Sequence, residues 1–255
     1  MKKEKEQSTG KAQYWIAGLI LLMGVAVSGL ILVRSGVIGG KAPAEGGKPS
    51  AQSAVEQEKR SHTVRFLNVD GSLIREETVP YGEPVLPPEV QQDNAVQTGW
   101  DGELFHIVED MEVTPTFQPL DTVKNAVYMN CVYQPVEDEI VMTITLGGQV
   151  DCCGFELEAA YDKELLKLLE AEPLLEGLQT EHKTKNGLLE LILPDGEDLR
   201  AETELVRLHF KCTKQDSYST TIPVLTREIH KRGEAGIGNT DSTAYDGRLY
   251  LMEKK

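Results

Sequence analysis

The residues that most often carry catalysis occur in this sequence, but not at the spacings that catalysis requires. No two histidines form an HxH or HExxH motif, and the sequence has no GxSxG motif and no glycine-rich phosphate loop. Carboxylates are abundant, which by itself does not indicate a glycosidase. The histidines are His62, His106, His182, His209 and His230. The sequence therefore predicts a protein that is not an enzyme and needs no cofactor.

The four cysteines lack the CxxC spacing of a structural zinc site, so no metal site is expected. Cys153 and Cys212 fall on inward-facing positions of two expected strands, which is compatible with a disulfide outside the cell and equally with two buried thiols. Neighbours in a regular strand face opposite sides, so Cys152 is expected to be exposed. The sequence assigns no partner to Cys131. Residues 233–247 carry oxygen-bearing side chains of the kind that bind calcium. They lack the spacing and the glutamate of an EF-hand, so we expect a plain surface loop there.

Binding chemistry has better support, because polar and apolar residues alternate along three expected strands. Residues 204–212 direct basic side chains outward, although the chain has a formal net charge of −15. In residues 186–195, the core-facing positions are Leu189, Leu191 and Leu193, and the residues between them are exposed. A face that mixes exposed apolar residues with placed charges suits a transient interface. The candidate partner-binding residues are Glu156, Glu158, Leu188, Glu190, Ile192, Arg207, His209 and Lys211.

A simpler alternative assigns these charges a purely structural role. Glu156 or Glu158 would pair across strands with Arg207 or Lys211, which contributes only ~0.2–1 kcal/mol and needs no partner. The strongly negative net charge argues against nucleic acid as the partner.

An N-terminal membrane anchor is expected at residues 14–33, a run of 20 residues without a charge. At ~1.5 Å per residue, a helix of this length spans the ~30 Å hydrocarbon layer. Lysines in residues 1–13 predict a cytoplasmic tail, which leaves the C-terminal domains outside the cell. A cleaved signal peptide is the alternative, but its apolar core would be shorter, about 7–15 residues. Residues 34–61 are rich in Gly, Pro, Ala and Ser and predict a flexible linker.

Residues 62–134 are expected to form a small β domain. HTVRFLNV and SLIREETV are strand candidates joined by the turn dipeptide Asp70-Gly71. Together with the later GWDG and EDMEVTPTF segments, these residues resemble the internalin-type B repeat, also called the Listeria–Bacteroides repeat. The resemblance implies a β-grasp-like module of surface proteins, in which Trp100 belongs to the core.

Residues 138–255 are expected to form a second β domain. IVMTITL, GFELEAAYD, NGLLELILPD, TELVRLHFKC, STTIPVL and GRLYLME all have the character of strands. One short helix, KELLKLLEA, is expected after Asp162, because its leucines recur at spacings of three and four.

This second set of segments resembles a cohesin domain in order and spacing over residues 138 to 253. The resemblance implies a jelly-roll β-sandwich that binds calcium-loaded dockerin modules through one sheet face. It also implies that the three strands carrying the candidate residues share that sheet. The predicted function is a membrane-anchored surface protein that recruits a dockerin-like or other secreted protein, with the repeat domain as a spacer or second adhesive unit. The alternative is a carbohydrate-binding or adhesive surface protein with a structural stalk role.

Overall fold

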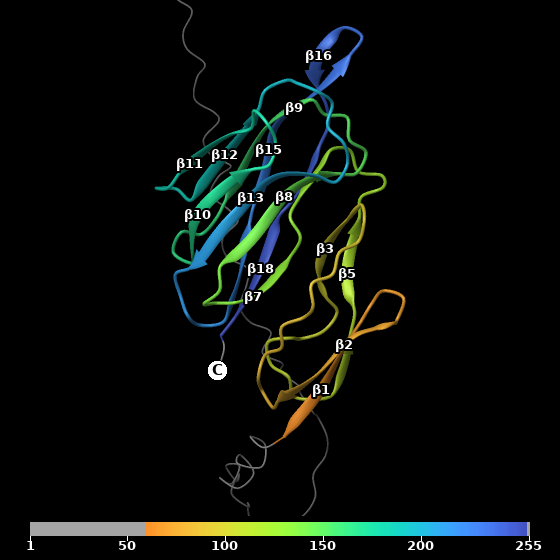
Figure 1. Ribbon diagram of the computed structural model, residues 1–255, viewed down its shortest axis with the longest axis vertical. Helices are drawn as coiled ribbons and strands as arrows, with labels where there is room; N and C mark the ends of the chain where they lie inside the picture. Colours follow the sequence, from red (N-terminus) through yellow and green to blue (C-terminus); the bar gives the residue numbers. More distant parts are fainter. Residues whose placement is uncertain (1–59, 254–255) are drawn as a thin grey trace, which may run out of the picture. The chain divides into compact units, whose positions relative to one another are not determined.

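The structure is a computed structural model that describes residues 60–253, and within them the chain forms strands and turns without a helix (Figure 1). The mainly β fold expected from the sequence is therefore confirmed. The expected cytoplasmic tail and membrane anchor, and nearly all of the expected linker, lie outside the described residues. Among residues 60–253, no helix is long and apolar enough to cross a membrane.

A first module comprises strands β1 to β5. Their bounds are β1 Ser61–Leu67, β2 Leu73–Pro80, β3 Ala95–Trp100, β4 Met111–Val113 and β5 Pro115–Pro119. β1 pairs with β2 as an antiparallel hairpin and with β4 in parallel, whereas β3 pairs with β5. The hairpin turns at Asp70-Gly71 as expected: Gly71 has a φ of 81°, and the Asp70 carboxylate accepts hydrogen bonds from the backbone and hydroxyl of Ser72. Trp100 is buried against Phe66, as expected of a core residue.

The remaining strands form a β-sandwich. Their bounds are β6 Ala126–Tyr128, β7 Val132–Pro135, β8 Ile140–Gly147, β9 Gly154–Ala160, β10 Leu166–Pro173, β11 Gln179–Lys183, β12 Leu188–Leu193, β13 Thr203–Cys212, β14 Tyr218–Ile222, β15 Val224–Gly233, β16 Gly236–Asn239, β17 Thr243–Tyr245 and β18 Gly247–Met252. One sheet, here the first sheet, has the order β10-β13-β8-β6-β17, and the second sheet has the order β11-β12-β9-β15-β16. A further sheet has the order β14-β18-β7.

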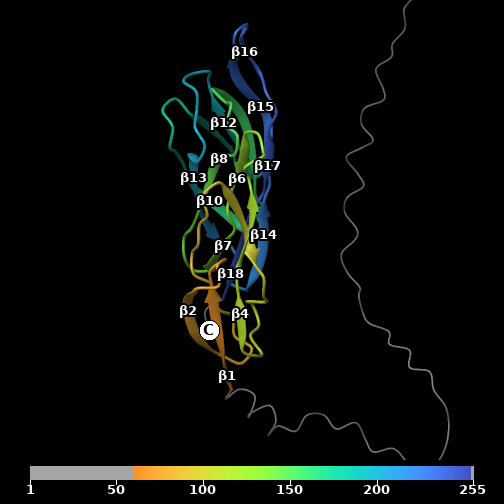
Figure 2. The ribbon, with the colours of Figure 1, turned by 90° about the vertical axis from the view of Figure 1, so that its right-hand side faces the viewer.

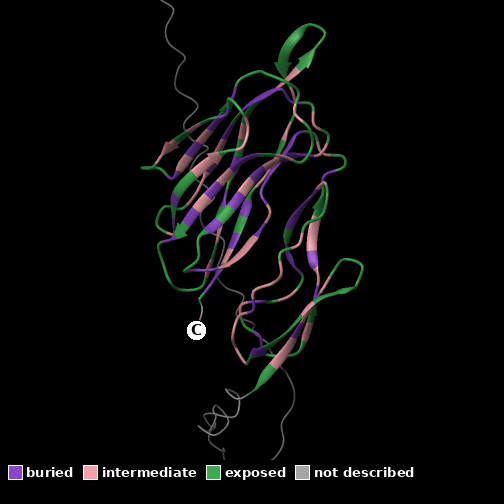
Figure 3. Cartoon of the chain, in the orientation of Figure 1, coloured by how far each residue is buried: buried purple, intermediate pink, exposed green. Residues whose placement is uncertain are grey.

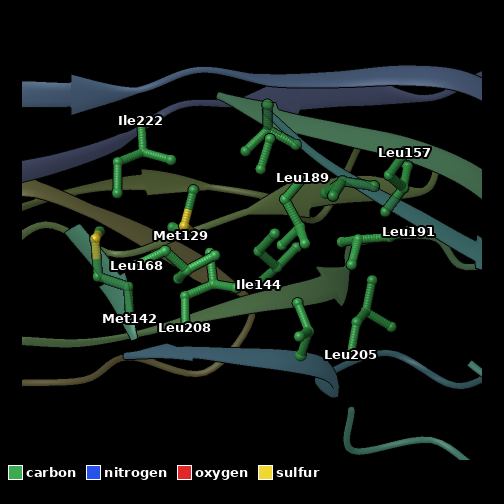
Figure 4. Packing of buried hydrophobic residues seen from close by; sticks show 14 of the residues in the cluster. Met129, Met142, Ile144, Leu157, Leu168, Leu189, Leu191, Leu205, Leu208 and Ile222 are labelled. Carbon is green, nitrogen blue, oxygen red and sulfur yellow. The ribbon is translucent and has the colours of Figure 1, made fainter. Parts of the chain in front are cut away.

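The two five-stranded sheets enclose one apolar core, to which long strands such as β8, β9, β12 and β13 contribute alternate side chains. The alternation of buried and exposed residues is visible along the strands in Figure 3, and Figure 4 shows the packed side chains. From β12, the core receives Leu189, Leu191 and Leu193, as the sequence predicts.

The expected helix after Asp162 is wrong, because this segment forms a turn followed by strand β10. Asp162 does accept a hydrogen bond from the backbone of Glu164, as a helix cap would, but only one turn follows. Leu166 and Leu168 then alternate into the core beside β13, and a register shift between Leu168 and Glu170 leaves Leu169 exposed. The leucines of this segment therefore have helical spacing in the sequence, although only Leu166 and Leu168 are buried in the strand.

The sandwich also begins earlier in the chain than residue 138. β6 pairs with β8, and β7 pairs with β18, although both lie in the segment that the sequence assigns to the first domain. Tyr133 of β7 and Met252 of β18 extend into the core of the first module, where Phe105 lies 6.0 Å from the ring of Tyr250. The first module and the sandwich therefore share buried side chains.

All four cysteines are free and buried, so the structure shows two thiols at Cys153 and Cys212 rather than a disulfide. Cys153 precedes the first residue of β9. Cys212 pairs with Leu166, the first residue of β10, which follows the other end of β9. A strand of this length separates them by roughly 20 Å. Cys152 is buried, contrary to expectation, because it lies in the turn before β9, where strand alternation does not apply.

Candidate partner-binding face

The outer side of the second sheet carries a row of carboxylates. Glu158 of β9 lies directly opposite Glu190 of β12, which in turn lies opposite Glu181 of β11. Residues directly opposite each other in an antiparallel pair point to the same side of the sheet, and like charges in such positions destabilise it. Three neighbouring strands thus place acidic side chains on one line, an arrangement with a cost in the free protein.

Two cations offset part of this repulsion. Lys183 donates a hydrogen bond to Glu190, and Arg227 donates one to Glu158 over 2.6 Å. These hydrogen bonds raise the pKa of Lys183 and of Arg227, so both stay cationic. Within the described residues, the carboxylates of Glu156 and Glu181 make no hydrogen bond or ion pair, which leaves the face with uncompensated negative charge.

Two apolar side chains stand exposed among these charges. Ile192 lies opposite Glu156 and is 40% exposed, and Leu225 lies opposite Glu158 and is 47% exposed. We call this surface the acidic face. It consists of Glu156, Glu158, Glu181, Lys183, Leu188, Glu190, Ile192, Leu225, Arg227 and Glu228.

A histidine bounds the acidic face at one end. The loop after β12 crosses the start of β9, where a Cβ on Gly154 would lie 2.6 Å from the carboxylate of Asp195. His230 contacts this carboxylate over 2.7 Å and that of Glu228 over 3.1 Å. The hydrogen bonds to Glu228 and Asp195 raise the pKa of His230. Protonated His230 on β15 therefore stabilises the position of the loop after β12 through its contact with Asp195.

The structure brings together five of the eight sequence-predicted residues: Glu156, Glu158, Leu188, Glu190 and Ile192. The expectation that all three strands share one sheet is wrong. β13 belongs to the first sheet, whereas β9 and β12 belong to the second sheet. The basic residues of β13 therefore lie on the outer side of the first sheet, on the other side of the sandwich from the acidic face. Alternation along a strand gives the side on which a residue lies, but not the sheet that the strand joins.

The residues of β13 also have neighbours of their own. Arg207 pairs with Glu172 of β10 over 2.8 Å, and His209 with Glu139 over 2.6 Å, while Lys211 is exposed. The alternative expectation, in which Glu158 pairs with Arg207 or Lys211 of β13, is therefore wrong as well. Glu158 pairs instead with Arg227 of β15.

Sequence reasoning missed the part of the acidic face that β11 and β15 supply. The missed residues are Glu181, Lys183, Leu225, Arg227 and Glu228. Polar–apolar alternation is weak in β11, and a register shift between Thr226 and Glu228 interrupts it in β15. A strand signal at STTIPVL was present, but it ended before the charged residues.

Within the described residues, every Phe, Tyr and Trp side chain is buried or half-buried. The same residues contain no group of three or more His, Cys, Asp and Glu side chains that could hold a metal ion. Residues 233–247, expected as a plain loop, form the end of β15 with β16 and β17.

No protein-family model matches the chain, and no curated protein matches it. Solved structures of cohesin modules are similar to about half of it. The seventh ScaB type I cohesin from Pseudobacteroides cellulosolvens has a TM-score of 0.46 and 12% identity, covering 51% of this chain and 93% of that one. A type I cohesin–dockerin complex from Clostridium thermocellum has a TM-score of 0.43 and 15% identity, covering 54% and 99%. A non-cellulosomal cohesin from Archaeoglobus fulgidus has a TM-score of 0.40 and 12% identity, covering 51% and 92%.

Proposed function

We propose that this protein is a non-catalytic binding protein whose β-sandwich recruits a protein partner through the acidic face. The observation that carries the proposal is the row Glu158, Glu190 and Glu181, set beside two exposed apolar side chains. In the free protein, Lys183 and Arg227 offset only part of the repulsion along this row, and the apolar side chains contact water. A partner with basic side chains around an apolar contact relieves both costs at once.

The sequence resemblance to cohesin domains suggests the class of partner. A calcium-loaded dockerin-like module, carried by a secreted or surface protein, is the occupant that we propose for the acidic face. The five acidic-face residues expected from the sequence belong to the strands that this resemblance implicates. Calcium would belong to the partner, since the proposal requires no metal of this chain.

We propose further that residues 14–33 anchor the protein in the cell membrane as a single span, with residues 1–13 in the cytoplasm. Residues 34–61 would then be the tether that holds the domains outside the cell. The support is the charge-free apolar run and the lysines before it. The first module, which resembles a surface-protein repeat, would present the sandwich away from the bilayer.

The test is a pull-down with the detergent-solubilised full chain as bait against the secreted proteins of the source organism. Captured proteins are identified by mass spectrometry, with and without a calcium chelator. We expect a calcium-dependent catch that carries a dockerin-like module. Ile192→Asp and Leu225→Asp should each abolish capture, because they bury a carboxylate at the centre of the contact.

Val141→Asp provides the matched control, since Val141 is an equally exposed apolar residue on the first sheet. The charge reversal Lys211→Glu controls for a change in net charge on that same outer side. Capture that survives Ile192→Asp and Leu225→Asp but is lost with Val141→Asp would contradict the proposal, because the interface would then lie on the first sheet. An empty pull-down, together with binding to a glycan array, would replace the proposal with polysaccharide adhesion.

A further inference from the structure

A second interaction surface lies on the first module, at the free edge of β2. Among the described residues, β2 pairs with β1 on one side and with no strand on the other (Figure 2). Only Val79 of this strand is buried, while Leu73 is 51% exposed and Ile74 is 38% exposed. An open edge of this length, with apolar side chains, is a template for an added strand.

The hydrogen-bonding pattern shows which backbone groups are available at this edge. The N–H of Tyr81 donates to the carbonyl of Arg60 over 2.8 Å, in line with the register of the β1–β2 pair. Because hydrogen-bonded and non-bonded positions alternate in an antiparallel ladder, Arg75, Glu77 and Val79 direct their backbone groups toward β1. The groups that point to the open edge are those of Glu76 and Thr78, because the register of the β1–β2 pair shifts at Ile74.

This arrangement of backbone groups limits how a second β2 strand can pair. In an antiparallel pairing centred on Glu76, Arg75 of one copy lies opposite Glu77 of the other. Ile74 is the extra residue at the register shift of the β1–β2 pair, so regular pairing with a second copy centres on Arg75, Glu76 and Glu77. Within this span, the strand complements itself in charge.

The neighbouring registers lack this complementarity. Centring the pair on Arg75 places two arginines opposite each other, and centring it on Glu77 places two glutamates opposite each other. In the favoured register, the two Glu76 side chains meet at the two-fold axis. Each of them pairs with Arg65 of its own chain, whose Nε lies 3.2 Å away, although Arg65 also pairs with Glu112 over 2.6 Å.

Charges on an edge strand usually prevent pairing with other chains. Arg75 and Glu77 form an ion pair within one chain over 3.2 Å, and Arg75 also donates a hydrogen bond to the carbonyl oxygen of Leu86. In a two-fold pair they face Glu77 and Arg75 of the second copy, so charges of alternating sign lie side by side. We propose that two copies of this chain associate through their β2 edges, which joins two three-stranded sheets into one continuous sheet. A two-fold contact of this kind closes on itself and does not propagate into a fibre.

The experiment measures the mass of the full chain by sedimentation velocity over the micromolar range, with detergent at constant concentration. We expect a dimer for the natural chain. Glu77→Arg places arginines opposite arginines and Arg75→Glu places glutamates opposite glutamates, so each variant alone should weaken association about tenfold or more. An equimolar mixture of the two should restore the dimer, because each strand then complements the other.

Two further variants separate pairing from folding. Glu76→Pro removes an N–H that points to the open edge and leaves the bonds to β1 intact, so it should prevent association without changing Trp100 fluorescence. Lys211→Glu changes charge far from β2 and should leave the dimer unchanged. A monomeric natural chain would overturn the proposal. So would a dimer that Glu77→Arg leaves intact, since association would then run through another part of the chain, or a mixture that forms no heterodimer.

Discussion

Replacing Met252 with alanine should weaken the first module more than the sandwich, although Met252 belongs to the last strand of the sandwich. Its side chain is 2% exposed and packs into the core that contains Phe66 and Trp100. Truncating a buried methionine to alanine costs ~2–5 kcal/mol. Met252 ends β18, where neighbouring atoms can partly fill the space, so we expect about 2–3 kcal/mol.

The assay compares two probes during urea unfolding of the full chain. With Trp15 replaced by phenylalanine, Trp100 is the single tryptophan and reports on the first module. Far-UV circular dichroism reports mainly on the sandwich, which holds most of the strands. In Met252→Ala, the Trp100 transition should occur at lower urea than the dichroism transition.

Leu251→Ala is the matched control, because Leu251 is the adjacent residue and is buried in the sandwich core instead. It should lower the stability by a similar ~2–5 kcal/mol without separating the two transitions. Coincident transitions in Met252→Ala, or an equal separation in Leu251→Ala, would contradict a stabilising role of Met252 in the first module.

Three more predictions concern a histidine, a glycine and the four cysteines. His230→Gln should remove a stabilising contribution of the protonated imidazole. This contribution is fully present below the ordinary histidine pKa of 6.5 and is lost as the pH rises through the raised pKa of His230. Urea titrations across this range should show that the difference in stability from the natural chain shrinks as the pH rises. Gly187→Ala should cost about 1–3 kcal/mol in urea unfolding, because φ is 61° and the new Cβ would lie 2.3 Å from the carbonyl oxygen of Tyr161. The cysteines should react with a thiol reagent only after unfolding, since burial raises the pKa of Cys131 to about 12 and of Cys152 to about 11; four reactive thiols in urea without reductant would confirm that no disulfide forms.

The sequence predicted the strands of the sandwich well wherever a strand is regular and half-buried. In β12, alternation alone separated the buried leucines from Glu190 and Ile192, because each residue faces either the core or solvent. The prediction failed in β10, where a bulge between Leu168 and Glu170 shifts the alternation. Pairing with β13 then decides the structure, and local leucine spacing does not record that contact.

The candidate site was predicted only in part for a related reason. The sequence places Glu158 and Arg207 correctly on the outer sides of their strands, but these sides face opposite directions in the sandwich. Strand pairing is a long-range property: β9 lies between β12 and β15, and β15 is more than sixty residues away in sequence. The row of carboxylates exists only after this pairing, so no local pattern could show it.

The two proposed surfaces lie on separate strands and share no residue, so they can operate together. If two chains pair through β2, each dimer presents two acidic faces, and a partner with two binding modules can occupy both. The second contact then forms at an effective concentration that reaches the millimolar range for short linkers, which raises the apparent affinity without any new contact. Glu77→Arg should therefore weaken capture of a two-module partner while leaving the affinity for a single module unchanged, measured by biolayer interferometry with the partner immobilised. Ile192→Asp should abolish binding of both the single module and the two-module partner, because it disrupts the contact that each module makes with the acidic face. Equal loss of single-module binding in Glu77→Arg would show that the two surfaces are not independent.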